Sequence, residues 1–320
     1  MHKCAEREGI MVEDKEIKTT ISPFAMREGE IKSFDGKDGY VSINQIIHKI
    51  NMGTITNVHF EILNIVNEFE FITSRQIFQV LESRGIELKS QLKLTNKLDQ
   101  LVKSKILTRY YFRSEDGKGA YRVYCLEKMG KYLLKSREIN CTWQPTDNTK
   151  PASLIKKRLA GNQIIIAYLR KASNYKKYVV KPQIKAKSLN KTFKAHGTVT
   201  IEKEGKAIDL VFECVRREED WIEHLTMRMN YYKDFYANFV PGDSGFAIKP
   251  QLILVCEDEK HMVETFKEIV SNNLEIPGMK LYFTTDLKQN LPTLDETLVE
   301  FDKDEEGKYK AINAKFKILG

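Results

Sequence analysis

The feature that most constrains the fold is a run of three amphipathic helical stretches and an alternating stretch, between about residues 55 and 140. NVHFEILNIVNEF and QLKLTNKLDQLVKSKI each place their apolar residues on one helical face. Between them, TSRQIFQVLESRG opens on Thr73 or Ser74 as N-cap and ends at Gly85. ILTRYYFRSEDGKGAYRVYCL alternates on both sides of a glycine-rich turn, which predicts a β-hairpin, and EKMGKYLLKSRE predicts a closing helix.

Three helices, a hairpin and a helix over roughly 80 residues is the order of a winged helix-turn-helix domain. We therefore predict a DNA-binding winged helix in residues 55–140, preceded by a flexible arm and a short helix capped by Ser42 in residues 1–54. The segment CTWQPTDNTKP carries two prolines and polar residues, which predicts a linker over 141–152. In such a domain the third helix enters the major groove and the hairpin tip contacts the DNA backbone.

Positive charge concentrates in the third predicted helix and the hairpin. Residues 89–124 contain nine lysines and arginines and three acids, a net charge of +6 within a chain of net charge +8. Lysines can bind the phosphates of DNA, whereas neutral polar side chains on the same helix can form hydrogen bonds with base edges. An ordinary solvated helix face and a protein-binding winged helix are the alternatives. The predicted DNA-binding residues are Lys89, Gln91, Lys93, Thr95, Asn96, Lys97, Lys103, Arg109, Arg113, Lys118 and Arg122.

Beyond the linker, helical and strand patterns alternate in the order α-β-β-β-α-β-α-β. This order predicts a mixed sheet flanked by helices over residues 153–290. Residues 291–320 form a C-terminal extension, for which the pattern allows either a strand pair or a frayed tail. The predicted fold class is α+β, with the winged helix followed by an α/β mixed-sheet domain.

One strand of the second domain, IDLVFECVR, carries the carboxylates Asp209 and Glu213. Metal-dependent nucleases hold Mg²⁺ with carboxylates on adjacent strands and use a nearby lysine to orient water. Here Val215 stands where that lysine is expected, and the preceding strand begins near His196 without an acid. Asp209 and Glu213 lie roughly 13 Å apart along a strand, too far to share one ion. We predict an inactive nuclease-like core with no catalytic residue and no metal, Asp209 and Glu213 being the candidates if it is active.

Three cations near this strand have their own interpretation. Arg216 stays charged and could anchor a phosphate. Arg228 and Lys233 flank the apolar stripe of a helix predicted at about 221–239. We expect the stripe to pack in the core. The two cations could face nucleic acid or water, and water is the expectation.

The remaining motifs exclude several function classes. The five cysteines include no CxxC pair, which argues against structural zinc and predicts buried thiols in a reducing cytoplasm. The N-terminus lacks an apolar signal region and no apolar run is long enough to span a bilayer, so we expect no membrane partner. No P-loop, G-x-G-x-x-G or H-E-x-x-H motif occurs, and the six histidines form no cluster of the kind a relaxase needs.

The stretches FEILNIVNEFEFITSRQIFQVL, NKLDQLVKSKILTRYYF and LVFECVRREEDWIEHLTMRMNYYKDFY resemble the replication-relaxation family of plasmid and conjugative-element proteins. The resemblance implies a winged helix joined to a degenerate restriction-endonuclease-like domain, and Val215 departs from an acid that the family often has at that position. It further implies sequence-specific binding of double-stranded DNA at an origin, in replication or conjugative transfer. A replication or relaxosome protein and a second copy of the chain are the further partners considered.

Two alternatives stay open. One is a Mg²⁺-dependent endonuclease that uses Glu213, in which case Mg²⁺ would be the cofactor; otherwise we expect none. The other is a transcriptional regulator of a mobile element.

Overall fold

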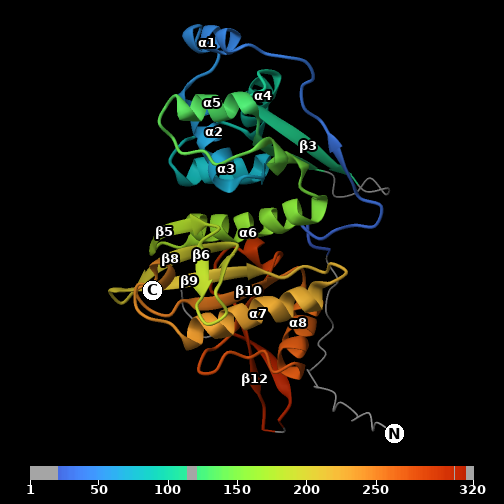
Figure 1. The fold of residues 1–320 in the computed structure, drawn as a ribbon, viewed down its shortest axis with the longest axis vertical. Coiled ribbons are helices and arrows are strands. Elements are labelled where there is room, and N and C mark those ends of the chain that lie inside the picture. Colours follow the sequence, from blue (N-terminus) through green and yellow to red (C-terminus); the bar gives the residue numbers. More distant parts are fainter. Residues whose placement is uncertain (1–20, 114–120, 306, 315–320) are drawn as a thin grey trace. The chain divides into compact units, whose positions relative to one another are not determined.

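The computed structural model describes residues 21–113, 121–305 and 307–314 (Figure 1). The chain divides into two compact units. The first, here called the N-unit, is Pro23–Arg170, and the second, the C-unit, is Lys171–Gly320 together with Met1–Ser22.

The N-unit is a mixture of helices and short strands. In chain order it contains β1 (Ile31–Phe34), α1 (Ile43–Asn51), α2 (Asn57–Phe69), β2 (Ile72–Thr73), α3 (Ser74–Ser83), α4 (Gln91–Lys103), β3 (Leu107–Arg113), β4 (Tyr121–Leu126), α5 (Lys128–Lys135), the 3-10 helix η1 (Pro145–Thr149) and α6 (Ala152–Lys171), whose last residue belongs to the C-unit.

Local sequence explains where these helices begin. The side chain of Ser42 accepts a hydrogen bond from the N–H of Gln45, and that of Thr73 accepts one from Gln76, so both predicted N-caps are confirmed. Ser90 caps α4 in the same way. The predicted apolar stripe of α4 is also confirmed, because its four members are buried: Leu94, Leu98, Leu101 and Val102.

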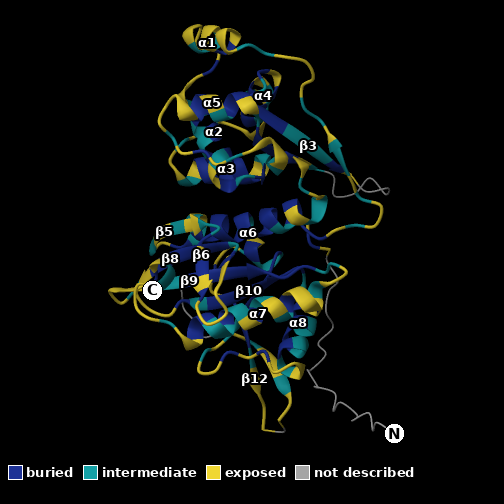
Figure 2. Ribbon diagram, viewed as in Figure 1, coloured by how far each residue is buried: buried dark blue, intermediate teal, exposed yellow. Residues whose placement is uncertain are grey.

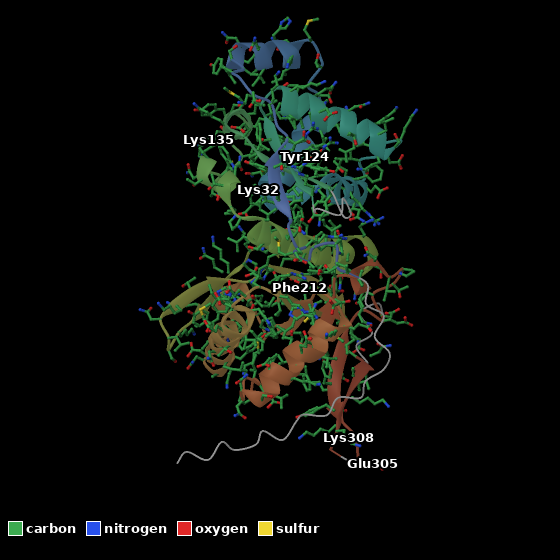
Figure 3. The ribbon with its side chains drawn as sticks, turned by 90° about the vertical axis from the view of Figure 1, so that its right-hand side faces the viewer. Lys32, Tyr124, Lys135, Phe212, Glu305 and Lys308 are labelled. Carbon is green, nitrogen blue, oxygen red and sulfur yellow. The ribbon has the colours of Figure 1, made fainter. Side chains whose placement is uncertain are left out.

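The predicted hairpin is present as β3 and β4, which pair antiparallel. They form the middle of a four-stranded sheet of order β1-β3-β4-β2. Lys32 of β1 and Tyr124 of β4 both lie in this sheet (Figure 3). The hairpin is thus part of a wider sheet, because β1 pairs with its β3 edge and β2 with its β4 edge.

The segment before α2 differs from the predicted flexible arm over residues 21–54. Here β1 pairs antiparallel with β3, from Ile31 opposite Arg113 to Phe34 opposite Tyr110. Glu30 forms an ion pair with Lys156 in which both side chains are about 2% exposed. These partners lie far along the chain, so local composition gave no sign of them.

The predicted linker over 141–152 is also an ordered part of the N-unit. It contains η1, and the buried Asn148 donates to the carbonyl of Leu126 at 2.9 Å. The units divide later, after Arg170, because α6 is bound to the N-unit. The amide of Asn162 donates to the carbonyls of Phe69 at 3.1 Å and Phe71 at 2.7 Å.

The C-unit is built on a large mixed sheet. Its elements are β5 (Tyr175–Val180), β6 (Gln183–Ala186), β7 (Lys191–Lys194), β8 (Gly197–Lys203), β9 (Lys206–Cys214), α7 (Trp221–Ala237), the 3-10 helix η2 (Asp243–Gly245), β10 (Gln251–Cys256), α8 (Glu259–Ser271), β11 (Tyr282–Thr285), the 3-10 helix η3 (Lys288–Asn290), β12 (Val299–Lys303) and β13 (Tyr309–Asn313).

Seven of these strands form one sheet in the order β13-β12-β11-β10-β9-β8-β5. The neighbours β9, β10 and β11 are parallel, and all other neighbours are antiparallel. The predicted mixed sheet and the α+β class are therefore confirmed. Of the two alternatives for the C-terminal extension, the strand pair is present as β12 and β13.

Helices α7 and α8 cover the central strands, whose residues are buried (Figures 1 and 2). The predicted stripe of α7 contributes Leu225, Met229, Tyr232 and Tyr236 to this core. The small hairpin formed by β6 and β7 packs against the same helix through Ile184 and Phe193. These residues belong to one hydrophobic core, and Glu213 of β9 lies beside it.

Candidate functional site

The first candidate site is the outward face of α4. Of its predicted contact residues, Lys89, Gln91, Lys93, Asn96 and Lys103 are exposed, and Thr95 and Lys97 are half-buried. No acid lies in the first turn of α4, so the partial positive charge of its N-terminus adds to that of the lysines. The hydroxyl of Thr95 donates to the carbonyl of Gln91 at 3.1 Å, which partly satisfies it within the helix. No ion pair with a described residue occupies these lysines, so this face can accept an anionic partner without breaking one.

The arginines of the hairpin are placed differently from one another. Arg113, at the end of β3, is exposed. Arg109 is half-buried and pairs with Asp99 and with Asp35, its Nε lying 2.9 Å from Asp35 Oδ2. Arg122 Nε lies 2.7 Å from the same oxygen. Asp35 directly follows β1 and lies outside residues 89–124, so the charge of that segment gave no sign of it. Lys118 lies outside the described residues.

The second candidate site surrounds Glu213, at the carboxyl end of β9. The residue is 3% exposed, and Phe212, which precedes it in β9, is fully buried. Figure 3 labels Phe212 in the C-unit. Arg228 of α7 donates through Nε to Oε1 at 3.0 Å and through Nη2 to Oε2. Tyr232, one helical turn later, donates its hydroxyl to Oε2 at 2.9 Å. The prediction that Arg228 faces water is therefore wrong, because its guanidinium neutralises this carboxylate.

His196 completes the group around Glu213. Its Nδ1 lies 3.5 Å from Glu213 Oε1 and accepts a hydrogen bond from the N–H of Cys214 at 3.1 Å. The contact with Glu213 is an ion pair only when the imidazole is protonated. Arg228 supplies the largest neutralising charge.

The pKa values follow from this arrangement. Burial acts to raise the pKa of Glu213, but the charges and hydrogen bonds of Arg228 and His196 together outweigh it and hold the pKa well below its usual range. Burial and then the charge of Glu213 raise the pKa of Tyr232 well above its usual value. The carboxylate is thus ionised and the phenol neutral at any physiological pH, and neither group is poised to exchange a proton.

The residues present do not fit the Mg²⁺ that the nuclease alternative requires. Both oxygens of Glu213 already accept from cationic or phenolic donors. Asp209 lies toward the other end of β9, opposite Thr200, whose hydroxyl donates to it. Val215 is buried in the apolar core. Among the described residues, no group of three or more histidines, cysteines or acids could hold a metal ion.

A second buried ion pair replaces the phosphate anchor predicted at Arg216. The guanidinium, 5% exposed, binds Asp286 through two hydrogen bonds of 2.7 and 2.9 Å. Burial would lower the pKa of Arg216, but the charge of Asp286 raises it above its usual range. Asp286 directly follows β11, and parallel pairing through β10 brings it beside the end of β9. Arg216 therefore joins strand ends and is not available to a ligand.

The comparison with known proteins gives only weak structural similarity. No known protein family and no curated protein matches the chain. Among solved structures, the restriction endonuclease FokI is similar at 9% identity, over 72% of this chain and 42% of FokI, with a TM-score of 0.22. The chain thus spans less than half the length of FokI, and this TM-score assigns neither fold nor activity. None of the helices within 21–113, 121–305 and 307–314 is both long and apolar enough to cross a membrane.

Proposed function

We propose that this chain is a sequence-specific double-stranded DNA-binding protein and that its N-unit acts as a winged helix-turn-helix domain. Helices α3 and α4 would form the helix-turn-helix, and α4 would enter the major groove. The hairpin of β3 and β4 would be the wing, with Arg113 near a phosphate. The observation that carries the proposal is the face of α4, where lysines and neutral polar side chains are exposed together beside a capped helix N-terminus.

The proposed contacts divide into two kinds. Lys89, Lys93 and Lys97 supply positive charge for phosphates. Gln91 and Asn96 are exposed amides, and such side chains pair with adenine in the major groove. Arg109 and Arg122 are left out of the proposed interface, because Asp35 and Asp99 occupy their guanidinium groups.

The biological setting rests on the resemblance to replication-relaxation proteins. It supports a role in replication or conjugative transfer of a plasmid or other mobile element through origin binding. A regulator of transcription in such an element would use the same interface, and mapping of bound DNA across the element separates the two by whether the site lies at an origin or a promoter. The endonuclease alternative loses support from the pairing of Glu213 with Arg228.

The test is a double charge reversal, Lys93→Glu with Lys97→Glu, measured by mobility shift on the mapped DNA. Retention should be lost, since two attractive groups become repulsive at the groove. The matched control is Lys128→Glu with Lys135→Glu on α5, which alters the net charge equally on exposed lysines of the same unit. Equal binding by the α4 variant and the α5 control would overturn the proposal.

A further inference from the structure

The strongest unassigned feature of the C-unit is a stretch of chain without acids. Residues 148–201 contain no aspartate or glutamate, and eight of them between 171 and 194 are lysines. Protein surfaces ordinarily intersperse both signs of charge, because like charges repel. An acid-free lysine run therefore marks a surface that holds uncompensated positive charge.

Much of this run forms the hairpin of β6 and β7, here called the basic hairpin (residues 183–194). Its strands pair antiparallel, with Gln183 opposite Lys194 and Lys185 opposite Thr192. Opposite residues in a pair point to the same face. These four side chains are exposed, whereas Ile184 and Phe193 on the other face are buried in the core.

The lysines of this region differ in whether an acidic side chain forms an ion pair with them. Lys176 lies 2.9 Å from Glu202, and Lys187 lies 2.6 Å from Asp243, so two of them are neutralised. Within the part of the chain that the structure describes, the exposed side chains of Lys185, Lys191 and Lys194 form no ion pair. Positive charge thus remains on the outward face and beside the turn.

The basic hairpin is held in a fixed position. Arg228 donates from Nη2 to the carbonyl of Lys194 at 2.9 Å while it also binds Glu213. The N–H of Lys185 donates to the hydroxyl of Ser244 at 3.2 Å, and the N–H of Ser188 donates to Asp234 at 3.1 Å. Its lysines are therefore presented from a rigid support, which lowers the entropy lost on binding an extended anion.

We propose that the basic hairpin is a nucleic-acid-binding surface of the C-unit that contacts the phosphate backbone without reading sequence. Lys185 and Lys194 on the outward face can contact neighbouring phosphates, and Gln183 and Thr192 can donate to the same oxygens. Lys191, opposite Ala186, adds positive charge beside the turn. Stacking on bases is not part of this surface, because its one aromatic residue, Phe193, is buried. This site is separate from the α4 face and stands or falls independently of it.

The test is the full-length triple variant Lys185→Gln, Lys191→Gln and Lys194→Gln, titrated with a random-sequence DNA duplex at several salt concentrations. Each lost phosphate contact reduces the slope of log K against log salt by about 1, so the slope should fall by about 3, equally for any sequence. The matched control, Lys249→Gln with Lys260→Gln and Lys267→Gln, removes the same charge elsewhere in the C-unit and should retain the slope. Thermal unfolding checks that the triple variant is folded.

The same titration in the Lys93→Glu, Lys97→Glu background separates the two proposals. If the α4 variant binds normally while the triple variant shows the smaller slope, the winged-helix proposal fails and the basic hairpin stands. If adding the three Gln substitutions changes neither slope nor affinity in either background, the basic hairpin is not a DNA surface.

Discussion

The α4 face and the surroundings of Glu213 use the same kinds of side chain in opposite ways. On α4, lysines are exposed and carry their charge to the solvent, where an anionic partner can meet it. Around Glu213, Arg228 is turned into the unit and binds a buried carboxylate together with Tyr232. A lysine or arginine therefore indicates an anion-binding surface only when its ion-pair partners within the protein are known. Both regions supply candidates from sequence, but only the first leaves its cations available.

The Arg228→Ala variant should show the largest loss of stability, and it tests whether Arg228 compensates the charge of Glu213. It leaves the carboxylate of Glu213 buried without its guanidinium, which should lower the free energy of unfolding by about 3–5 kcal/mol. Urea unfolding followed by circular dichroism measures it.

The double variant Arg228→Met with Glu213→Gln is the control. Because it removes both charges together, it should be markedly more stable than Arg228→Ala alone. Equal stability of the single and double variants would show that Arg228 contributes packing and not charge compensation.

A second expected effect concerns His261. This buried histidine is held in its neutral form, whereas the buried Glu213 is ionised and paired with Arg228. Burial, then the charges of Arg217 and Arg216, lower the pKa of His261 to about 3 from 6.5. The unfolded chain takes up this proton first, so stability should fall as the pH drops from about 6.5 toward 3, by up to about 1.4 kcal/mol per pH unit.

His261→Gln removes this proton uptake and should flatten that part of the curve. Urea midpoints of both proteins at about pH 7.5 and about pH 5 measure the difference. Above pH 6.5 their difference in stability should be constant. Parallel curves down to about pH 5 would mean that His261 is protonated in the folded protein.

The smallest expected effect separates two arginines that the sequence treats alike. Arg113→Gln should reduce the salt slope of DNA binding by about 1, since an exposed arginine at the end of β3 can reach a phosphate. Arg122→Gln should leave the slope unchanged, because Asp35 already holds that guanidinium. The same mobility-shift titration measures both, and equal slopes for the two variants would contradict the distinction.

Local patterns predicted much of the fold. The caps at Ser42 and Thr73 and the buried leucines of α4 depend on residues within a few positions of one another. The mixed sheet followed from the alternation of helical and strand patterns. Such features are encoded by short-range spacing, which a single sequence displays directly.

Partners distant along the chain could not be predicted in this way. Asp35 meets Arg109 and Arg122 only because β1 pairs with β3, and Arg228 meets Glu213 only because α7 packs beside β9. Each contact depends on tertiary packing that no local window contains. The basic hairpin did have a sequence signal, namely the absence of acids over 148–201, but which of its lysines lack an acidic partner depends on tertiary contacts.

The pairing of β1 with β3 has a consequence for any shorter version of the N-unit. A fragment that begins at residue 55 would uncover the backbone N–H and C=O groups of residues 110–113, which β1 pairs, and leave one whole edge of the seven-residue strand β3 open. A long exposed strand edge is a template for pairing with other chains, whereas the four-residue β1 offers a much shorter one. Residues 31–34 thus protect the sheet from self-association, and fragments intended to isolate this unit should start before them.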